Sequence, residues 1–215
     1  MRITTKGRYG LRAVINLAMA HHNRPISISS IATEEKVSSE FLEQIFFKLK
    51  KAGLIGAIGS GINELGMIPR LLDLMDLDFF LVALPYTLLA QNVLDAEFPR
   101  CAAAGIGFVI GGVFASGILA TGAVPGAKVN YADATPEAME KVRRIEAVCA
   151  RHKVPLPAAA LQFPLGHPSV ASVIPGALTP DQVRRNVAAF RHPIPADLWA
   201  ELKHEGLLRA DAPTP

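Results

Sequence analysis

Apolar positions follow two different rhythms along the 215 residues of the chain. In residues 1–54 they recur every three or four positions, a spacing that predicts amphipathic helices. Beyond Leu54, short apolar and β-branched runs alternate with stretches of helical spacing, which predicts β/α units. We therefore expect two parts, residues 1–54 and residues 55–215.

Three helices are predicted in the first part. The first spans Arg8 to His21 and carries one apolar stripe, formed by Leu11, Val14, Ile15, Leu17 and Ala18. A short second helix is capped by Ser27 or Ser29. The third starts at Ser38 or Ser39 and ends at Gly53. This is the order of a helix-turn-helix, whose last helix enters the major groove of DNA.

Charge separates the same two parts. Residues 1–54 carry nine Lys or Arg and four Asp or Glu, whereas residues 55–215 carry thirteen and fifteen, so a net +5 precedes a net −2. A local positive field attracts a phosphate backbone. An ordinary three-helix cap with a solvated charged face would show the same pattern. The expected DNA contacts are Lys6, Arg8, Ser38, Ser39, Glu43, Gln44 and Lys48.

Three segments of the first part carry a resemblance: residues 1–10 (MRITTKGRYG), residues 31–33 (IAT) and residues 37–54 (VSSEFLEQIFFKLKKAGL). They resemble the N-terminus of bacterial winged-helix repressors of the iron-sulfur-cluster and cysteine-metabolism regulator type. The resemblance implies that the helix starting near Ser38 reads DNA. After Leu54 the family's wing, dimerisation helix and three clustered cysteines are missing, so we expect weak DNA binding and no iron-sulfur cluster.

Four strands and intervening helices are predicted in residues 55–215. The strands are expected at residues 55–58, 79–84, 107–111 and 171–174, and the glycines of residues 59–61 are expected in a loop. The helices are expected at residues 65–75, 93–103, 136–152 and 157–163, and after Thr179 and Pro195. Four parallel β/α units are half of a (β/α)8 TIM-type barrel. A Rossmann half is the alternative, but the glycine spacing differs from its fingerprint.

Residues 101–127 contain no charged residue and could span a bilayer by length. Seven glycines and Pro125 favour a buried strand followed by a glycine-rich loop instead. The basic, polar N-terminus does not resemble a secretion signal. Cys101 and Cys149 lie far apart and lack neighbouring ligands, so neither a disulfide nor a metal site is indicated. A cytoplasmic protein without membrane contact is expected.

A capped helix after the last strand is the sharpest local motif. Thr179 can cap it, Pro180 suits its first position and Gln182 completes a capping box. With Arg184 and Arg185 close behind, this helix start suits a phosphate, although Asp181 opposes an anion. An ordinary capped helix is the alternative reading.

Four segments carry a second resemblance: residues 86–91 (YTLLAQ), 111–122 (GGVFASGILATG), 143–152 (RRIEAVCARH) and 167–176 (HPSVASVIPG). They look like the C-terminal half of an aldo-keto reductase, nearest to the aldose 1-dehydrogenase branch that oxidises fucose or galactose. The resemblance implies that NAD or NADP is bound, with no metal. The implied cofactor residues are Tyr86, Ser116, Gly117, Leu119, Gly176, Thr179, Gln182, Arg185 and Asn186.

The same resemblance limits the expected chemistry. Catalysis in this family depends on an Asp, a Tyr, a Lys and a His from the first four strands, and that half has no counterpart here. We therefore expect no catalytic residue, and loss of aldose oxidation unless a partner completes the site. The open first and last strands need cover, for which a homodimer or a complementing half barrel are candidates. The alternative function is a transcriptional regulator that binds DNA through residues 1–54. The chain would then be a chimera of two protein families, in which the half barrel binds a ligand or forms a dimer.

Overall fold

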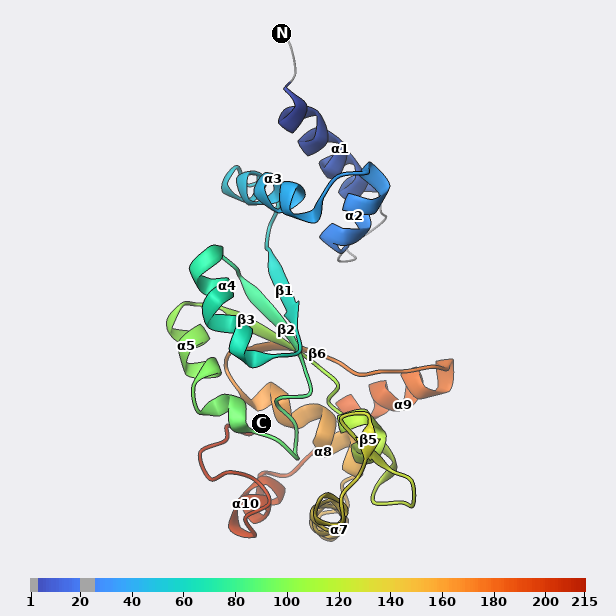
Figure 1. Ribbon diagram of the computed structural model, residues 1–215. Coiled ribbons are helices and arrows are strands. Elements are labelled where there is room, and N and C mark those ends of the chain that lie inside the picture. Colours follow the sequence, from blue (N-terminus) through green and yellow to red (C-terminus); the bar gives the residue numbers. More distant parts are fainter. Residues whose placement is uncertain (1–3, 20–25) are drawn as a thin grey trace. The chain divides into compact units, whose positions relative to one another are not determined.

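The computed structural model describes residues 4–19 and 26–215 (Figure 1). The chain forms two compact units, Met1–Ile58 and Gly59–Pro215. The division therefore falls between Ile58 and Gly59, a few residues beyond the change in sequence pattern.

The first unit contains three helices, α1 (Thr5–Met19), α2 (Ile28–Glu35) and α3 (Ser39–Lys51). Ser27 caps α2 by accepting a hydrogen bond from the amide of Ser30 at 3.0 Å. Ser38 caps α3 in the same way, accepting from the amide of Phe41 at 3.2 Å. The capping predictions are confirmed. The C-terminal end predicted for the first helix, near His21, lies outside the described residues.

The predicted apolar stripe of α1 is confirmed only in part, because Leu17 packs against the core but Leu11 and Ile15 do not. Leu11 and Ile15 are 55% and 51% exposed, whereas Ala13 is fully buried. Gly10 is buried as well, and a Cβ at this position would lie 3.2 Å from Cγ2 of Ile45 in α3. Small residues allow two helices to approach closely, so α1 packs through Gly10 and Ala13, with Leu17 also against the core and Leu11 and Ile15 exposed.

Four parallel strands form the sheet of the second unit, in the order β1 (Gly59–Ile62), β2 (Phe79–Ala83), β3 (Gly107–Gly111) and β6 (Val170–Ile174). The last three agree with the predicted strands to within one residue. The α/β class with a parallel sheet is confirmed. Spatial order follows chain order, so each new strand is added at the edge of the sheet.

The first predicted strand is displaced. Ile55 and Ile58 pack against the core of the helical unit, and pairing starts only at Gly59. The predicted loop at residues 59–61 is thus part of β1. Gly59 stands beside Phe79 in the sheet, and a Cβ there would lie 2.3 Å from the Phe79 ring. The glycine is needed because a neighbouring aromatic ring occupies the space of a side chain.

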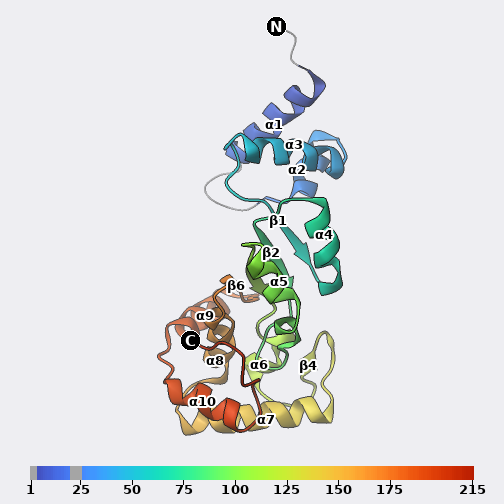
Figure 2. The same ribbon diagram turned by 90° about the vertical axis from the view of Figure 1, so that its left-hand side faces the viewer.

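Seven helices accompany the sheet (Figures 1 and 2). They are α4 (Ile68–Leu74), α5 (Glu97–Ala103), α6 (Ile118–Thr121), α7 (Pro136–Arg151), α8 (Leu156–Gln162), α9 (Pro180–Arg191) and α10 (Ala196–His204). A small antiparallel hairpin, β4 (Lys128–Val129) and β5 (Ala132–Asp133), was not predicted. In the described ranges, 4–19 and 26–215, no helix is both long enough and apolar enough to cross a membrane.

The two faces of the sheet differ in burial. On one face, Phe80, Val82, Phe108 and Ile110 are fully buried. The alternating residues of the other face are only half buried; they include Phe79, Leu81 and Val109. Side chains of successive strand residues point to opposite faces, so one face carries the core of the unit and the other is partly open.

The core contains an aromatic cluster centred on Phe98 of α5. Its ring stacks on Phe108 with centroids 4.2 Å apart and meets the ring of Tyr86 at 5.0 Å and that of His167 at 4.5 Å. Aromatic pairs at these separations add to the stability that area burial supplies. The cluster joins β3, α5 and the segments that follow β2 and α8.

Charged side chains connect α7 to α10. Arg151 Nε donates to Glu201 Oε1 at 2.7 Å, and His152 Nε2 also contacts the Glu201 carboxylate. Hydrogen bonds from His152 and then Arg151 lower the pKa of Glu201 from its ordinary value of 4.5. A carboxyl whose pKa is lowered by folding stabilises the fold above its unfolded pKa, and the contribution is lost as pH falls through the folded pKa.

Substitution Glu201→Gln is expected to flatten the dependence of unfolding on pH in the acid range, because the titrating group is removed. Thermal midpoints measured over a pH series test this expectation. Glu140→Gln, which alters a surface pair within α7, is the matched control and should keep the parental slope. An unchanged slope in Glu201→Gln would contradict the assignment.

Candidate functional site

A hollow of about 580 Å³ lies at the carboxyl ends of β1 and β2. Asn63 follows β1 directly, and Ala83, Leu84 and Pro85 stand at the end of β2. Ligands of parallel α/β sheets bind outside the carboxyl ends of the strands, where successive loops converge. The remaining lining residues are Leu65, Ala90, Asn92, Val93, Asn130 and Tyr131.

Unusual backbone conformations gather at the same edge. Leu84 has φ +75°, and the consecutive residues Ala115, Ser116 and Gly117 have φ +47°, +63° and +110°. Residues with side chains rarely adopt positive φ, and such strain concentrates at functional sites. The hydroxyl of Ser116 accepts a hydrogen bond from the amide of Tyr131 at 2.9 Å. The loop after β3 is thereby fastened to the β4–β5 hairpin.

The residues predicted for cofactor binding follow three strands of the sheet. Ser116, Gly117 and Leu119 come after β3, and Gly176 to Asn186 come after its neighbour β6. Gly111 pairs with Ile174, so both segments leave the sheet at the same level. Leu119 itself is fully buried, and only its backbone could meet a ligand.

The backbone amides of Thr179 and Gln182 at the start of α9 are hydrogen-bonded within the helix's own capping box. Thr179 Oγ1 accepts from the amide of Gln182 at 3.3 Å, and Gln182 Oε1 accepts from the amide of Thr179 at 3.2 Å. Asn186 Nδ2 donates to the carbonyl of Gly176 at 3.3 Å. The capping box is confirmed, and it engages the side chains of Thr179 and Gln182 that were expected to contact phosphate.

Arg185 is the predicted cofactor residue that offers a free charge. Its side chain is exposed, and within the described residues it makes no ion pair. The adjacent Arg184 instead pairs with Asp181 one turn earlier. An exposed guanidinium can form two parallel hydrogen bonds to a phosphate. Among the predicted cofactor residues, Arg185 can therefore offer its charge to an anionic group.

Tyr86, a predicted cofactor residue, follows β2 but is enclosed in the core. The residue is fully buried, with its ring 5.0 Å from Phe98 and 4.9 Å from Phe163. Its hydroxyl has no hydrogen-bond partner in the described part of the chain. Burial and, secondarily, the Asp211 carboxylate raise the pKa of Tyr86. An enclosed ring cannot contact a nicotinamide, so this prediction is wrong for this structure.

Substitution Tyr86→Phe is expected to raise the free energy of unfolding by about 1–3 kcal/mol, because it removes a buried hydroxyl without a partner and keeps the ring. Urea titration measures the change. Tyr131→Phe is the control; Tyr131 is 81% exposed, and its replacement should leave stability unchanged. Destabilisation by Tyr86→Phe would show that the hydroxyl is hydrogen-bonded.

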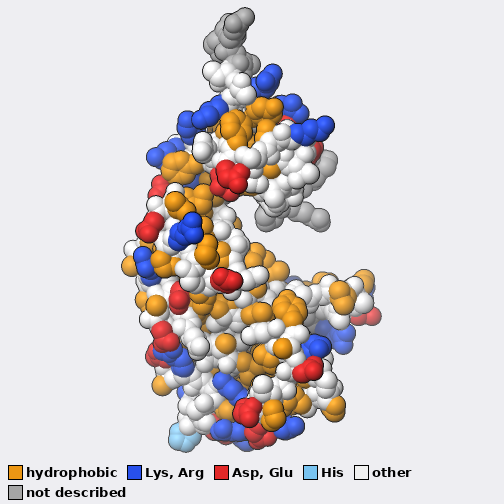
Figure 3. All heavy atoms as spheres, viewed as in Figure 1, with side chains coloured by type: hydrophobic (Ala, Val, Ile, Leu, Met, Phe, Trp, Pro, Cys, Tyr) orange, Lys and Arg blue, Asp and Glu red, His pale blue; other side chains and the backbone are white. Residues whose placement is uncertain are grey.

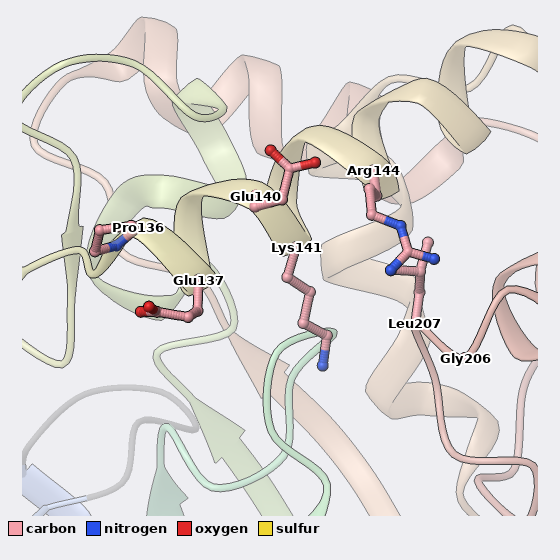
Figure 4. Close-up of a pocket in the computed structure, with 7 residues that line it drawn as sticks. All are labelled: Pro136, Glu137, Glu140, Lys141, Arg144, Gly206 and Leu207. Atoms are coloured by element: carbon pink, nitrogen blue, oxygen red, sulfur yellow. The ribbon is translucent and has the colours of Figure 1, made fainter.

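A second hollow, of about 530 Å³, lies along α7 (Figure 4). In Figure 4, Lys141 extends toward the loop after β2, and Arg144 turns toward Leu207. Lys141 Nζ donates to the carbonyl of Leu89 at 3.3 Å, and Arg144 Nη2 donates to the carbonyl of Glu205 at 2.8 Å. Burial lowers the pKa of Lys141. Both cations are already hydrogen-bonded to backbone carbonyls of the protein, so this hollow is a poor binding site for an anion.

The residues predicted to contact DNA lie on α1 and α3, together with the α3 cap. Gln44 and Lys48 are exposed and line a hollow of about 230 Å³ with Lys6. Arg8 is exposed, and Ser39 and Glu43 are half exposed, whereas the Ser38 hydroxyl is engaged in capping. Figure 3 shows many basic side chains over the first unit. A basic surface with exposed amide and lysine groups can meet phosphates and base edges.

Sequence reasoning missed Asn63. The only available signal was its position immediately after β1, and that strand was predicted four residues too early.

Both cysteines are free and buried, and burial raises the pKa of the Cys149 thiol to about 11. In the part of the chain that the structure describes, no cluster of His, Cys, Asp or Glu is able to hold a metal ion.

Comparison with known proteins identifies two kinds of relative. The chain is 43% identical over 162 residues to pyridoxal 4-dehydrogenase of Microbacterium luteolum, covering 75% of this chain and 47% of the relative. It is 38% identical over 169 residues to D-threo-aldose 1-dehydrogenase of a Pseudomonas species, covering 78% and 50%. Over 58 residues it is 47% identical to the transcriptional regulator CymR of Bacillus subtilis, covering 27% and 42%.

The chain thus spans about half the length of the two dehydrogenases, and the regulator match covers a short segment. An aldo-keto reductase from Bacillus halodurans, solved in its holo form, has a similar fold, with a TM-score of 0.59 and 24% identity. That similarity covers 79% of this chain and 56% of that one. A model of the aldo/keto reductase family matches residues 18–205, starting within the first unit. The chain belongs to the aldo/keto reductase family.

Proposed function

We propose that the second unit binds NAD or NADP at the carboxyl edge of its sheet. The observation that carries the proposal is Arg185, an exposed guanidinium on the helix that follows β6, which makes no ion pair with any residue that the structure describes. A dinucleotide brings phosphate charge, which a planar guanidinium matches with paired hydrogen bonds. The strained backbone at Ser116 and Gly117, after the neighbouring strand, offers a close approach to the same ligand.

The bound cofactor would accept a hydride, and the substrate class we propose is an aldose. Support comes from D-threo-aldose 1-dehydrogenase, a relative whose name states its action on an aldose. The catalytic Asp, Tyr, Lys and His implied by family resemblance would come from strands with no counterpart in this chain. We therefore propose that this chain binds cofactor without turnover, because oxidation would require a half barrel that carries those four residues.

Fluorescence titration with NADH and NADPH tests cofactor binding. Arg185→Ala is expected to raise the Kd about 10- to 150-fold, since a hydrogen bond to a charged group contributes about 1.5–3 kcal/mol. Arg184→Ala is the matched control, because Arg184 is paired with Asp181 and should change the Kd little. Equal affinities of the two variants, or no binding by the parent chain, would refute the proposal.

DNA binding by the first unit is a second candidate function. It is supported by the match to a transcriptional regulator and by the exposed Gln44 and Lys48 on α3. In this reading the second unit is a ligand or dimer module of a regulator. The missing wing leaves α3 as the main contact, so affinity should be low and strongly dependent on salt.

Retention on immobilised duplex DNA over a salt series tests this function. Lys48→Ala should reduce the slope of log K against log salt by about one phosphate contact. Arg100→Ala, an exposed cation of the second unit, should leave the slope unchanged. Absence of retention at low salt, with the helices folded, would exclude DNA binding.

A further inference from the structure

The sheet of the second unit has two open edges. β1 pairs only with β2, and β6 pairs only with β3, among the residues that the structure describes. Unpaired strand edges tend to associate with other strands. The open edges are of opposite kind, one on the first strand and one on the last, so β6 of one chain can accept β1 of another in the parallel direction.

Exposed apolar side chains gather beside these two edges. Near β6 they are Ile174, Leu178, Val183, Val187 and Phe190, and after β1 they are Met67 and Leu74. Leu178 is 94% exposed, and α9 contains no buried residue at all. Figure 3 shows apolar side chains over α9. Several large apolar side chains exposed on one helix mark an interaction surface, so α9 beside the β6 edge has the character of an interface.

A groove of about 560 Å³ runs between β6, α8 and α9. Val183, Val187 and Phe190 line it from α9, and Leu161 and Leu165 line it from the other side. In a β/α barrel the helix after each strand packs against that strand and the next one. The groove between β6 and α9 therefore lies beside the place of the next parallel strand, which α9 would also cover.

We infer that a second copy of this chain fills the groove and closes an eight-stranded barrel. A twofold axis along the barrel keeps all strands parallel and forms the same contact twice, β6 against β1 of the partner copy. Met67 and Leu74 then meet the apolar face of α9. The half-buried face with Phe79, Leu81 and Val109 becomes the barrel interior, which side chains fill in eight-stranded barrels.

Closure of the barrel also means that residues of both copies form the cofactor site; this part of the inference rests on the proposed function. Within one chain, Asn63 follows β1 and Arg185 follows β6, at opposite edges of the sheet with β2 and β3 between them. In the closed dimer, Asn63 of one copy lies next to the Gly176–Asn186 segment of the other. Each copy alone therefore holds only part of the site.

Sedimentation measurements on the full chain test the dimer. The expected species has a mass of about 46 kDa, twice the 23.0 kDa of one chain. Val187→Asp places a charge in the groove and should yield monomer. Ala188→Asp adds the same charge at the next, exposed position outside the groove and should remain dimeric. A monomeric parent, an open-ended polymer series, or a dimer insensitive to Val187→Asp would overturn the inference.

Mixing of variants tests the composite site. Asn63→Ala and Arg185→Ala should each bind cofactor weakly as homodimers. After random exchange of subunits, about a quarter of all sites combine Asn63 with Arg185 and regain parental affinity. No recovery after proven exchange overturns the composite site. A Val187-dependent dimer that binds no cofactor refutes the proposed function and leaves the barrel dimer standing, so the two failures are distinguishable.

Discussion

Replacement of Phe98 by alanine is expected to lower the free energy of unfolding of the second unit by about 3–5 kcal/mol. Phe98 is fully buried and its ring meets the rings of Phe108, Tyr86 and His167. Alanine would leave a cavity among rigid rings that cannot collapse into it, and the aromatic contacts would be lost as well. Total stabilities of domains are about 5–15 kcal/mol, so the loss is a large fraction.

Hydrogen exchange followed by mass spectrometry measures this change for each unit separately. Phe98→Leu is the matched control and should cost less, because leucine refills most of the volume. Exchange in α1, α2 and α3 should stay at the parental rate, since the cluster belongs to the second unit. A loss below about 1 kcal/mol in Phe98→Ala would contradict the central place of this ring.

Substitution Leu42→Ala is expected to unfold the first unit and to abolish any DNA retention. Leu42 is fully buried in a core of few residues, with Ala13, Ile31 and Phe46 beside it. Loss of a buried leucine costs about 2–5 kcal/mol, and a unit of this size has little stability in excess. Circular dichroism measures the loss of helix, and hydrogen exchange of the α3 amides measures the loss of protection in the first unit.

Leu11→Ala is the matched control for Leu42→Ala. It makes the same chemical change in the same unit, but Leu11 is 55% exposed, so stability should change by less than about 0.5 kcal/mol. Cofactor affinity, which concerns the second unit, should be the same in both variants. If Leu42→Ala leaves the helices protected from exchange, the assigned core is wrong.

Helix starts were predicted well where a serine or threonine caps the helix. Ser27, Ser38 and Thr179 each cap the helix for which they were expected. A cap is a local interaction between a side chain and an amide two or three residues later, so the pattern needs no knowledge of tertiary contacts. The strands β2, β3 and β6 were predictable for a related reason, since buried parallel strands form short apolar runs.

The first strand could not be predicted because two cores compete for the same apolar residues. Ile55 and Ile58 have strand propensity, yet they pack against the helical unit, and the glycines after them form β1. The local pattern of apolar residues does not show which of the two cores a side chain will join. The apolar stripe of α1 was predicted only in part for a similar reason: Leu17 joins the core, but the close contact with Ile45 is made by Gly10, and Leu11 and Ile15 stay exposed.

The sequence indicated the positive charge near the start of α9 but did not indicate the burial of Tyr86. Arg185 follows a strand and a capped helix start, and its exposure agrees with that expectation. Tyr86 was expected at the cofactor only from the family resemblance, and a tyrosine ring can equally join a core, as it does here. Asn63 became a candidate only once the sheet showed that β1 ends at Ile62.

The agreement between strand order and chain order has a consequence for synthesis on the ribosome. β1, β2 and β3 can pair as each emerges, because every neighbour has already been made. β6 is separated from β3 by the long segment between Gly111 and Val170. At about 5–20 residues per second, translation of that segment leaves the β3 edge uncovered for about 3–12 seconds. During this interval a nascent chain is most open to chaperones, and to mispairing with a neighbour on the same messenger RNA.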